Sequence, residues 1–331
     1  MNRGRKIVLS MMCVFVIATI AFVACHNESD PTPADDGIEY LIPDDAKVIV
    51  DNAKFFKIPG QEEFLMRDGD LAVGIGVSAI RYYLPNDIKH YQEYYNLLNS
   101  DRDVNILKLT IGNKTEKGFP VIKVILPSED EYLETKERWN YLLQSEVETR
   151  STTSLVNVIP NTSTMNAVFN HIKNLNCPLA APVASNYCIP FRYATDGCFA
   201  RAHYMRKILS DYGYNCWKIF SFGDLQATSL ATGCCAEWDW HVAVIVNVDT
   251  GVSTAQYVFD PSLFSQPISV STWLNKQKGC GSSNSGSVDS YSIVSSENYA
   301  YNWSPGSYST DNDYTSTLAF LNSYANASGC Y

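Results

Sequence analysis

The chain has 331 residues, of which 46% are hydrophobic and 18% are charged, and this composition excludes a disordered or fibrous protein. Its 25 Lys and Arg residues against 35 Asp and Glu residues give a net charge of −10, which argues against nucleic acid or anionic lipid as a partner. At the usual size of a domain, the length suggests about two domains.

Residues 1–25 have the pattern of an export signal. Three basic residues precede a mostly apolar stretch, residues 7–23, which leads to Cys25. We predict a bacterial lipoprotein signal in which Cys25 becomes the lipidated first residue, with an ordinary signal peptide or an N-terminal membrane anchor as the alternatives. The protein is then an exported outer-membrane lipoprotein that touches the membrane only through its lipid.

Residues 26–153 form an acidic segment without cysteine, with a net charge of −10. A helix is predicted after Ser128, because Ser128 and Glu131 match a capping box. We predict a small α+β domain that ends in a polar linker, where Arg150 is exposed to proteases. Its predicted strands are residues 47–56, 71–80 and 118–127.

Residues 154–331 differ in both charge and cysteine content, which predicts a second domain. Their net charge is −3, and in an oxidising compartment their eight cysteines are expected to form four disulfides. These cysteines are Cys177, Cys188, Cys198, Cys216, Cys234, Cys235, Cys280 and Cys330.

Cys198 has a local context that favours a free thiol. Asp196 is expected to cap a helix that continues to Gly213, so that Cys198 lies in the first helical turn. Unpaired N–H groups and the positive helix end lower the pKa of a thiol there, as a nucleophile requires. A disulfide or a buried small side chain is the alternative. If Cys198 is free, the remaining cysteines are odd in number, so that another stays free or pairs outside the chain.

His241 is the best placed histidine to act as its base. It opens an apolar run, residues 241–248, that is typical of a buried strand, whereas His203 lies on the helix of Cys198 without facing it. A turn centred on residues 250–251 returns the chain so that Asp260 lies directly opposite His241. The carboxylate can then fix the tautomer of the imidazole and stabilise its charged form.

Three sequence blocks resemble the active-site blocks of the bacterial protein glutaminases, in the same order. They are DGCFARAH (196–203), CCAEWDWHVA (234–243) and FDPSLF (259–264), and the resemblance extends from about residue 155 to residue 280. It implies an α+β catalytic domain with a core similar to transglutaminases and papain-like proteases. In such a core the nucleophile lies at a helix N-terminus, and the His and Asp lie on adjacent antiparallel strands.

The resemblance also implies a triad of Cys198, His241 and Asp260, and a precursor in which residues 26–153 are an inhibitory pro-region. An activating protease is expected to cut near Arg150. The expected reaction is hydrolysis of glutamine side chains in proteins or peptides to glutamate and ammonia, through a thioester on Cys198. We expect a monomer that needs no cofactor or metal, because no histidine or cysteine spacing suggests zinc.

The sequence says less about the residues around the triad. The backbone N–H of Cys198 is the expected oxyanion donor. Trp238 is a candidate second donor and Trp240 a candidate cleft residue, although both can equally be core aromatics. Residues 281–331 hold fewer cysteines than the family usually has. We predict the disulfides Cys177–Cys188, Cys216 with Cys234 or Cys235, and Cys280–Cys330.

Two other classes of function stay open. A transglutaminase or a papain-like cysteine protease uses the same triad, and differs in the acyl acceptor or in the bond that is cut. A non-catalytic, lipid-anchored surface protein is the other class, and it requires Cys198 to be bridged in a disulfide.

Overall fold

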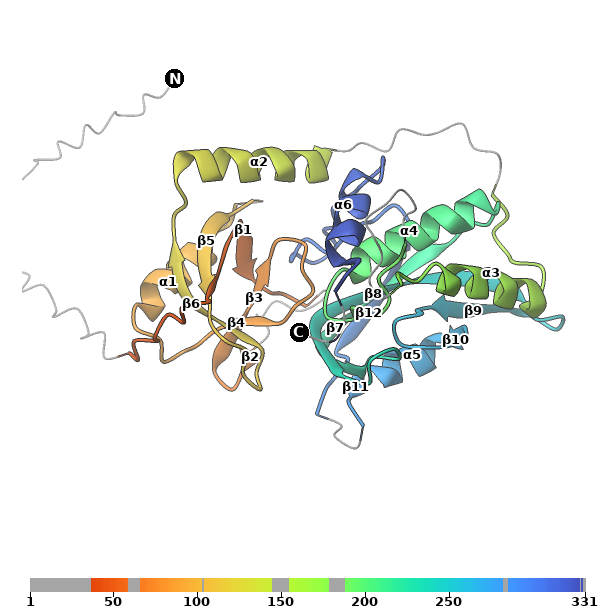
Figure 1. Cartoon of the computed structure of the whole chain (residues 1–331), viewed down its shortest axis with the longest axis horizontal. Coiled ribbons are helices and arrows are strands. Elements are labelled where there is room, and N and C mark those ends of the chain that lie inside the picture. The colour runs from red at the N-terminus through yellow and green to blue at the C-terminus, as the bar shows by residue number, and fades with distance from the viewer. Residues whose placement is uncertain are drawn as a thin grey trace, which may run out of the picture. The chain divides into compact units, whose positions relative to one another are not determined.

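The computed structural model describes residues 37–58, 66–102, 104–144, 155–178, 188–281, 285–327 and 329. From Gly37 onward the chain belongs to one compact unit, which contains two six-stranded sheets (Figure 1). The predicted export signal with Cys25, the predicted cleavage region at Arg150, and Cys330 lie outside the described residues. Among the helices that the structure describes, none is long and apolar enough to cross a membrane.

The N-terminal sheet has the strand order β1-β5-β6-β4-β3-β2. Its strands are β1 (Lys47–Phe55), β2 (Met66–Arg67), β3 (Asp70–Ile75), β4 (Tyr82–Leu84), β5 (Ile106–Ile111) and β6 (Phe119–Ile125). Two helices accompany it, α1 (Tyr91–Leu98) and α2 (Glu129–Gln144). The predicted strand at residues 71–80 is too long, because β3 ends at Ile75 and the chain then leaves the sheet.

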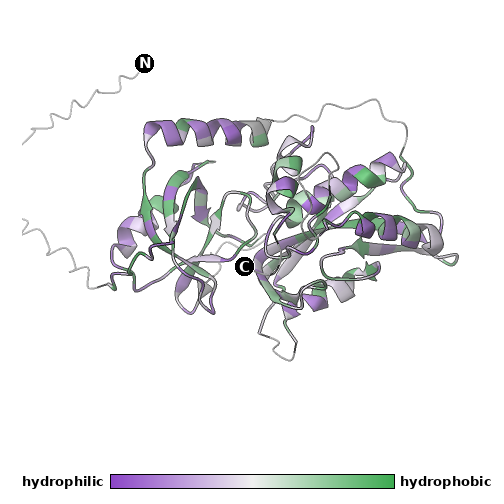
Figure 2. Ribbon diagram, viewed as in Figure 1, coloured by the Kyte–Doolittle hydropathy of each residue, from purple (hydrophilic) through white to green (hydrophobic). Residues whose placement is uncertain are grey.

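Helix α2 begins at the predicted capping box, where the backbone N and Oγ of Ser128 both lie 2.9 Å from a carboxylate oxygen of Glu131. The helix is largely hydrophilic (Figure 2). Trp139 and Leu142 are nevertheless buried, and α2 packs against β1 and β5. The acidic segment therefore has a covered sheet, as its α+β composition predicts.

The C-terminal sheet has the order β10-β9-β8-β7-β11, and β12 pairs with β7. Its strands are β7 (Trp217–Thr228), β8 (Cys235–Asp249), β9 (Thr254–Phe259), β10 (Ile268–Ser269), β11 (Lys278–Gly279) and β12 (Ser290–Ser295). The helices are α3 (Thr162–Asn174), α4 (Cys198–Asp211), α5 (Val270–Lys276) and α6 (Thr315–Tyr324). Helix α4 packs between β8 and α6, which places the predicted thiol helix against the predicted histidine strand.

The register of β8 and β9 differs from the prediction. Val244 pairs with Phe259 and Asp249 with Thr254, so each partner lies two residues further along the chain than predicted. The reason is the turn, in which the backbone N–H of Thr250 bonds the carbonyl of Ser253 and closes a four-residue loop. Strand β8 also begins at Cys235, so His241 lies inside the strand rather than at its start.

The cysteines pair in part as predicted. A disulfide joins Cys177 to Cys188, as expected. The second described disulfide joins Cys235 to Cys280, so the predicted pairing of Cys280 with Cys330 is wrong. Cys234 is also disulfide-bonded, whereas Cys216 is a free buried thiol, so its predicted pairing with Cys234 or Cys235 is wrong as well. Cys216 is therefore the second free thiol that an odd count requires.

Candidate active site

Cys198 lies in the first turn of α4, as predicted, and is its first residue, but the helix is not capped by Asp196. The N-cap is Gly197, whose φ of 74° lies in the left-handed region that favours glycine. A Cβ at Gly197 would also lie only 2.8 Å from the ring of Tyr324. The carboxylate of Asp196 instead accepts hydrogen bonds from the backbone N–H groups of Gly197 and Ala79.

The thiol of Cys198 is free and almost fully buried, with 1% of the residue exposed. A hydrogen bond from the backbone N–H of Val242 places the sulfur beside the segment that carries His241. Burial raises the pKa of Cys198 from 9.0 to about 12, against the lowering effect of the nearby Arg201 guanidinium. The predicted lowering of this pKa is therefore wrong for the buried thiol seen in the structure, because desolvation outweighs the effect of placing Cys198 at the helix start.

His241 and Asp260 form a buried pair in which His241 Nε2 lies 2.8 Å from Asp260 Oδ2. Asp260 follows the last residue of β9, so the carboxylate reaches the ring diagonally rather than from a directly opposite position. His241 Nδ1 is buried and has no hydrogen-bond partner among the described residues. One ring nitrogen is thus held by the carboxylate of Asp260, and the other, Nδ1, can accept a proton from an acidic group.

Trp273 on α5 completes this arrangement, and nothing in the sequence pattern singled it out. Its indole N–H donates to the same Oδ2 of Asp260 at 2.9 Å, and its ring stacks on His241 with a centroid distance of 5.6 Å. Burial raises the pKa of Asp260, but the charge of His241 and the hydrogen bonds from His241 and Trp273 outweigh it and lower this pKa. The carboxylate is therefore held ionised next to the imidazole.

The two candidate tryptophans lie in different places. Trp238 stacks on His241 with a centroid distance of 4.6 Å, and its indole N–H donates to the carbonyls of Ala194 and Thr195. That N–H is therefore already engaged, and Trp238 lines the site through its ring. Trp240 is fully buried against Phe199, as in the core interpretation of the sequence.

A segment of the N-terminal half covers this site. After β3, Ser78 donates to Asp196 Oδ2 at 2.9 Å, and the backbone N–H of Ala79 donates to Asp196 Oδ1 at 3.1 Å. The carbonyl of Ala79 accepts from the backbone N–H of Asp239 at 3.2 Å, and Ile80 forms an antiparallel bridge with Trp238. The chain therefore runs across the site between the segment before Cys198 and the strand of His241.

His203 and His171 are not part of this arrangement. His203 is buried on α4, where its ring lies 2.7 Å from Lys218 Nζ, and His171 is exposed on α3. In the part of the chain that the structure describes, no group of three or more His, Cys, Asp or Glu side chains could hold a metal ion. The chemistry that this geometry offers is that of a thiol, an imidazole and a carboxylate.

Comparison with known proteins places the chain among glutaminases. A family model described as "Glutaminase" matches residues 165–277. The chain is similar to a crystal structure of pro-protein-glutaminase, with 31% identity over 86% of this chain and 95% of that chain and a TM-score of 0.65. It is similar to an A47Q2 mutant of pro-protein-glutaminase, with 30% identity over the same shares and a TM-score of 0.66. An NMR structure of protein-glutaminase from Chryseobacterium proteolyticum matches with 39% identity over 53% of this chain and 93% of that chain and a TM-score of 0.46. No curated protein sequence matches the chain.

Proposed function

Since this chain belongs to the protein-glutaminase family in its precursor form, we propose that it deamidates glutamine side chains of proteins or peptides through Cys198, His241 and Asp260. The observation that carries this proposal is the buried His241–Asp260 pair, at 2.8 Å, beside a free cysteine at a helix N-terminus. The same three residue types serve nucleophilic catalysis on unrelated folds.

The proposed reaction begins when His241 Nδ1 takes the proton of the Cys198 thiol. The thiolate attacks the side-chain carbonyl carbon of glutamine, and the backbone N–H of Cys198 stabilises the oxyanion at the helix start. The imidazolium then protonates the leaving nitrogen, and ammonia departs from a thioester. Water, deprotonated by His241, hydrolyses the thioester to glutamate and the free thiol, while Asp260 keeps the ring oriented.

We propose further that the N-terminal half keeps the precursor inactive until a protease cuts near Arg150 and the N-terminal half is removed. Two observations support this. The segment of Ala79 and Ile80 occupies the path between Asp196 and Trp238 that a substrate would need. The buried thiol has a pKa of about 12, so almost none of it is thiolate at neutral pH. Removal of the segment admits both water and substrate.

The export of the protein belongs to the same proposal. Lipidation at Cys25 would anchor the precursor to the outer membrane, and cleavage near Arg150, followed by removal of the N-terminal half, would release the C-terminal half as a monomer. Both positions lie outside the described residues. Labelling with a radioactive fatty acid, followed by comparison with a Cys25→Ser chain, tests the anchor.

Ammonia release from a glutamine-rich protein tests the function. The full-length chain is treated by limited proteolysis and then assayed, with intact substrate mass as a second readout. We expect a mass gain of about one dalton per released ammonia and no release by Cys198→Ala. Cys216→Ala is the matched control, because Cys216 is the other free buried thiol among the described residues and lies outside the site. Chain cleavage indicates a protease, and incorporation of an added amine indicates a transglutaminase; full release by Cys198→Ala refutes the proposal.

A further inference from the structure

The segment that covers the site also inserts a buried cation into the C-terminal half. The side chain of Arg81 is 3% exposed, and its guanidinium forms an ion pair with Asp224. Its Nη2 donates to the carbonyls of Leu225 at 3.0 Å and Trp238 at 3.3 Å, and its Nε lies 3.7 Å from Asp239. Two carboxylates and two carbonyls therefore converge on one guanidinium.

This pocket is built by the C-terminal sheet itself. Asp239 lies on β8 and is fully buried, and Asp224 lies on β7 at a register shift between Phe222 and Leu225. Such a bulge redirects side chains and is common beside active sites. The carbonyl of Asp224 accepts from the backbone N–H of Ser287, which fixes the bulge from the C-terminal half. The pocket therefore does not depend on the N-terminal half for its position.

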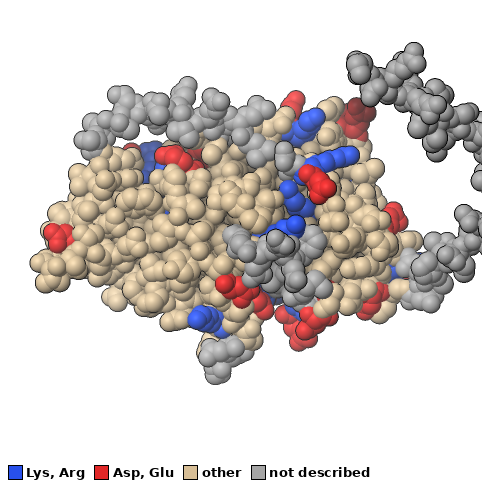
Figure 3. Space-filling model, turned by 180° about the vertical axis from the view of Figure 1, so that it is seen from behind, with Lys and Arg blue, Asp and Glu red and all other residues tan. Residues whose placement is uncertain are grey.

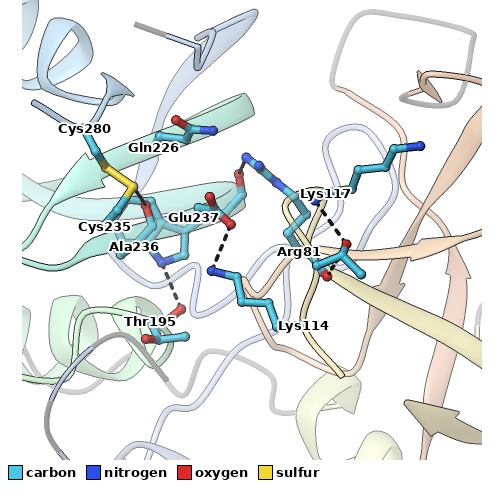
Figure 4. Close-up of polar contacts among 12 residues, drawn as sticks. Arg81, Lys114, Lys117, Thr195, Gln226, Cys235, Ala236, Glu237 and Cys280 are labelled. Atoms are coloured by element: carbon cyan, nitrogen blue, oxygen red, sulfur yellow. Dashed lines mark hydrogen bonds and ion pairs between the residues drawn. A yellow bond between two sulfur atoms is a disulfide. The ribbon is translucent and has the colours of Figure 1, made fainter. Parts of the chain in front are cut away.

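A second cation of the N-terminal half lies close by. Lys114 Nζ is 3.2 Å from Glu237, two residues before Asp239 on the same strand. Arg81 and Lys114 both extend from the N-terminal half toward this strand (Figure 4). On the face seen in Figure 3, basic and acidic side chains likewise lie next to one another near the middle of the molecule. When the N-terminal half leaves, these carboxylates lose the positive charges of Arg81 and Lys114.

The contacts of residues 79–81 show how many residues separate the pocket from the nucleophile along a bound chain. The main chain of Ala79 is held between Asp196, two residues before Cys198, and Asp239, two residues before His241. Ile80 continues as an extended chain against Trp238, and Arg81 enters the pocket. Consider a substrate peptide that follows the same path, with its glutamine at the position of Ala79. The residue two positions C-terminal to that glutamine then lies in the pocket.

We propose that Asp224, Asp239 and the carbonyls of Leu225 and Trp238 form a specificity subsite for a cationic side chain two residues C-terminal to the target glutamine. This inference rests on the proposed deamidase function and names its substrate class, peptides and proteins with the sequence Gln-X-Arg. A neutral side chain fills the pocket without offering a positive charge or N–H donors to the buried Asp239 and the partly exposed Asp224, which disfavours its binding. Arginine is preferred over lysine, because several acceptors in different directions match a planar guanidinium.

The test compares synthetic peptides that differ at one position, with the full-length chain after limited proteolysis as the enzyme. The peptides contain Gln-Ile-Arg, Gln-Ile-Ala or Gln-Ile-Glu, and a fourth carries its arginine two residues before the glutamine. We expect kcat/KM for ammonia release to be roughly 10- to 100-fold higher for Gln-Ile-Arg than for Gln-Ile-Ala. The Glu peptide is expected to be the poorest, and the fourth peptide to behave like the Ala peptide.

Variants separate recognition from folding. Asp224→Ala should reduce the Arg-to-Ala ratio of kcat/KM toward one, whereas Asp211→Ala, which removes an exposed carboxylate paired with Lys207 on α4, should keep the ratio. Equal rates for the Arg and Ala peptides overturn the subsite and leave the deamidase function standing. An equal loss on both peptides in Asp224→Ala also overturns it, since it indicates a structural role. The absence of ammonia from every peptide refutes the proposed function instead.

Discussion

Removal of the N-terminal half should convert Cys198 from an unreactive thiol into a reactive one. The perturbation is limited proteolysis of the full-length chain near Arg150, carried on until the N-terminal half is degraded. In the covered state Cys198 is 1% exposed, and burial raises its pKa from 9.0 to about 12. In the uncovered state water reaches the sulfur, while the helix N-terminus and Arg201 continue to favour the thiolate.

The size of the effect follows from these values. A return of the pKa from about 12 to 9.0 increases the thiolate fraction at pH 8 by about a thousandfold. Only the thiolate reacts with iodoacetamide, so the alkylation rate constant should rise by at least a similar factor. Below the pKa the rate of either state should increase about tenfold for each added pH unit.

The assay is a time course of alkylation with peptide mapping, before and after proteolysis. Cys216 is an internal control on the same chain, because burial raises its pKa to about 12 as well and its charged neighbours Arg206, Lys218 and Glu297 all belong to the C-terminal half. Cys216 should stay protected after cleavage. Equal alkylation of Cys198 before and after proteolysis would refute the covering role of the N-terminal half, and equal exposure of both cysteines would indicate unfolding instead.

Three further results are expected. Trp273→Phe removes the hydrogen bond to Asp260 and should lower kcat about tenfold. Trp240→Phe should lower kcat much less, because the indole N–H of Trp240 has no hydrogen-bond partner among the described residues. Steady-state ammonia release measures both variants. Because the pKa of Asp260 is lowered below 3.8, its carboxylate stabilises the fold above that pH and loses this contribution as the pH falls through the folded value. The difference in unfolding free energy between the wild type and Asp260→Asn, from urea titrations, should therefore shrink below about pH 4. Replacing Cys235 and Cys280 by serine should cost about 3 to 4 kcal/mol in the same titration, and no change would mean that the bridge does not constrain the unfolded chain.

Local patterns predicted most of the elements that carry the site. The capping box at Ser128 marks the start of α2, the apolar run after His241 lies in β8, and Cys198 is the first residue of α4. These features depend on neighbours in the sequence, where hydrogen bonding and side-chain periodicity act directly. The proximity of His241 and Asp260 was also predictable, because a hairpin joins them.

Features that depend on distant contacts were not predictable. Asp196 does not cap α4, because its carboxylate is used by Ala79, which lies 117 residues earlier. The pKa of Cys198 is raised rather than lowered, because the fold buries its sulfur away from solvent. The pairing of Cys235 with Cys280 joins positions 45 residues apart, and sequence spacing does not select among such pairs. In each case the deciding partner comes from a part of the fold that local patterns do not place.

The contacts of the covering segment also determine what activation requires. Cleavage near Arg150 cuts the chain between the halves but leaves intact the ion pair of the buried Arg81 with Asp224 and the hydrogen bonds of Ala79. Release of the N-terminal half must withdraw the buried guanidinium of Arg81 from Asp224, from Asp239 and from the carbonyls of Leu225 and Trp238, and breaking this set of contacts is costly. The cut N-terminal half is therefore expected to stay bound as an inhibitor until it is unfolded or degraded. In the released enzyme, the arginine of a Gln-X-Arg substrate then takes the place of Arg81, the cation that holds the precursor closed. The strength of inhibition by the N-terminal half and the preference of the enzyme for arginine therefore depend on the same pocket.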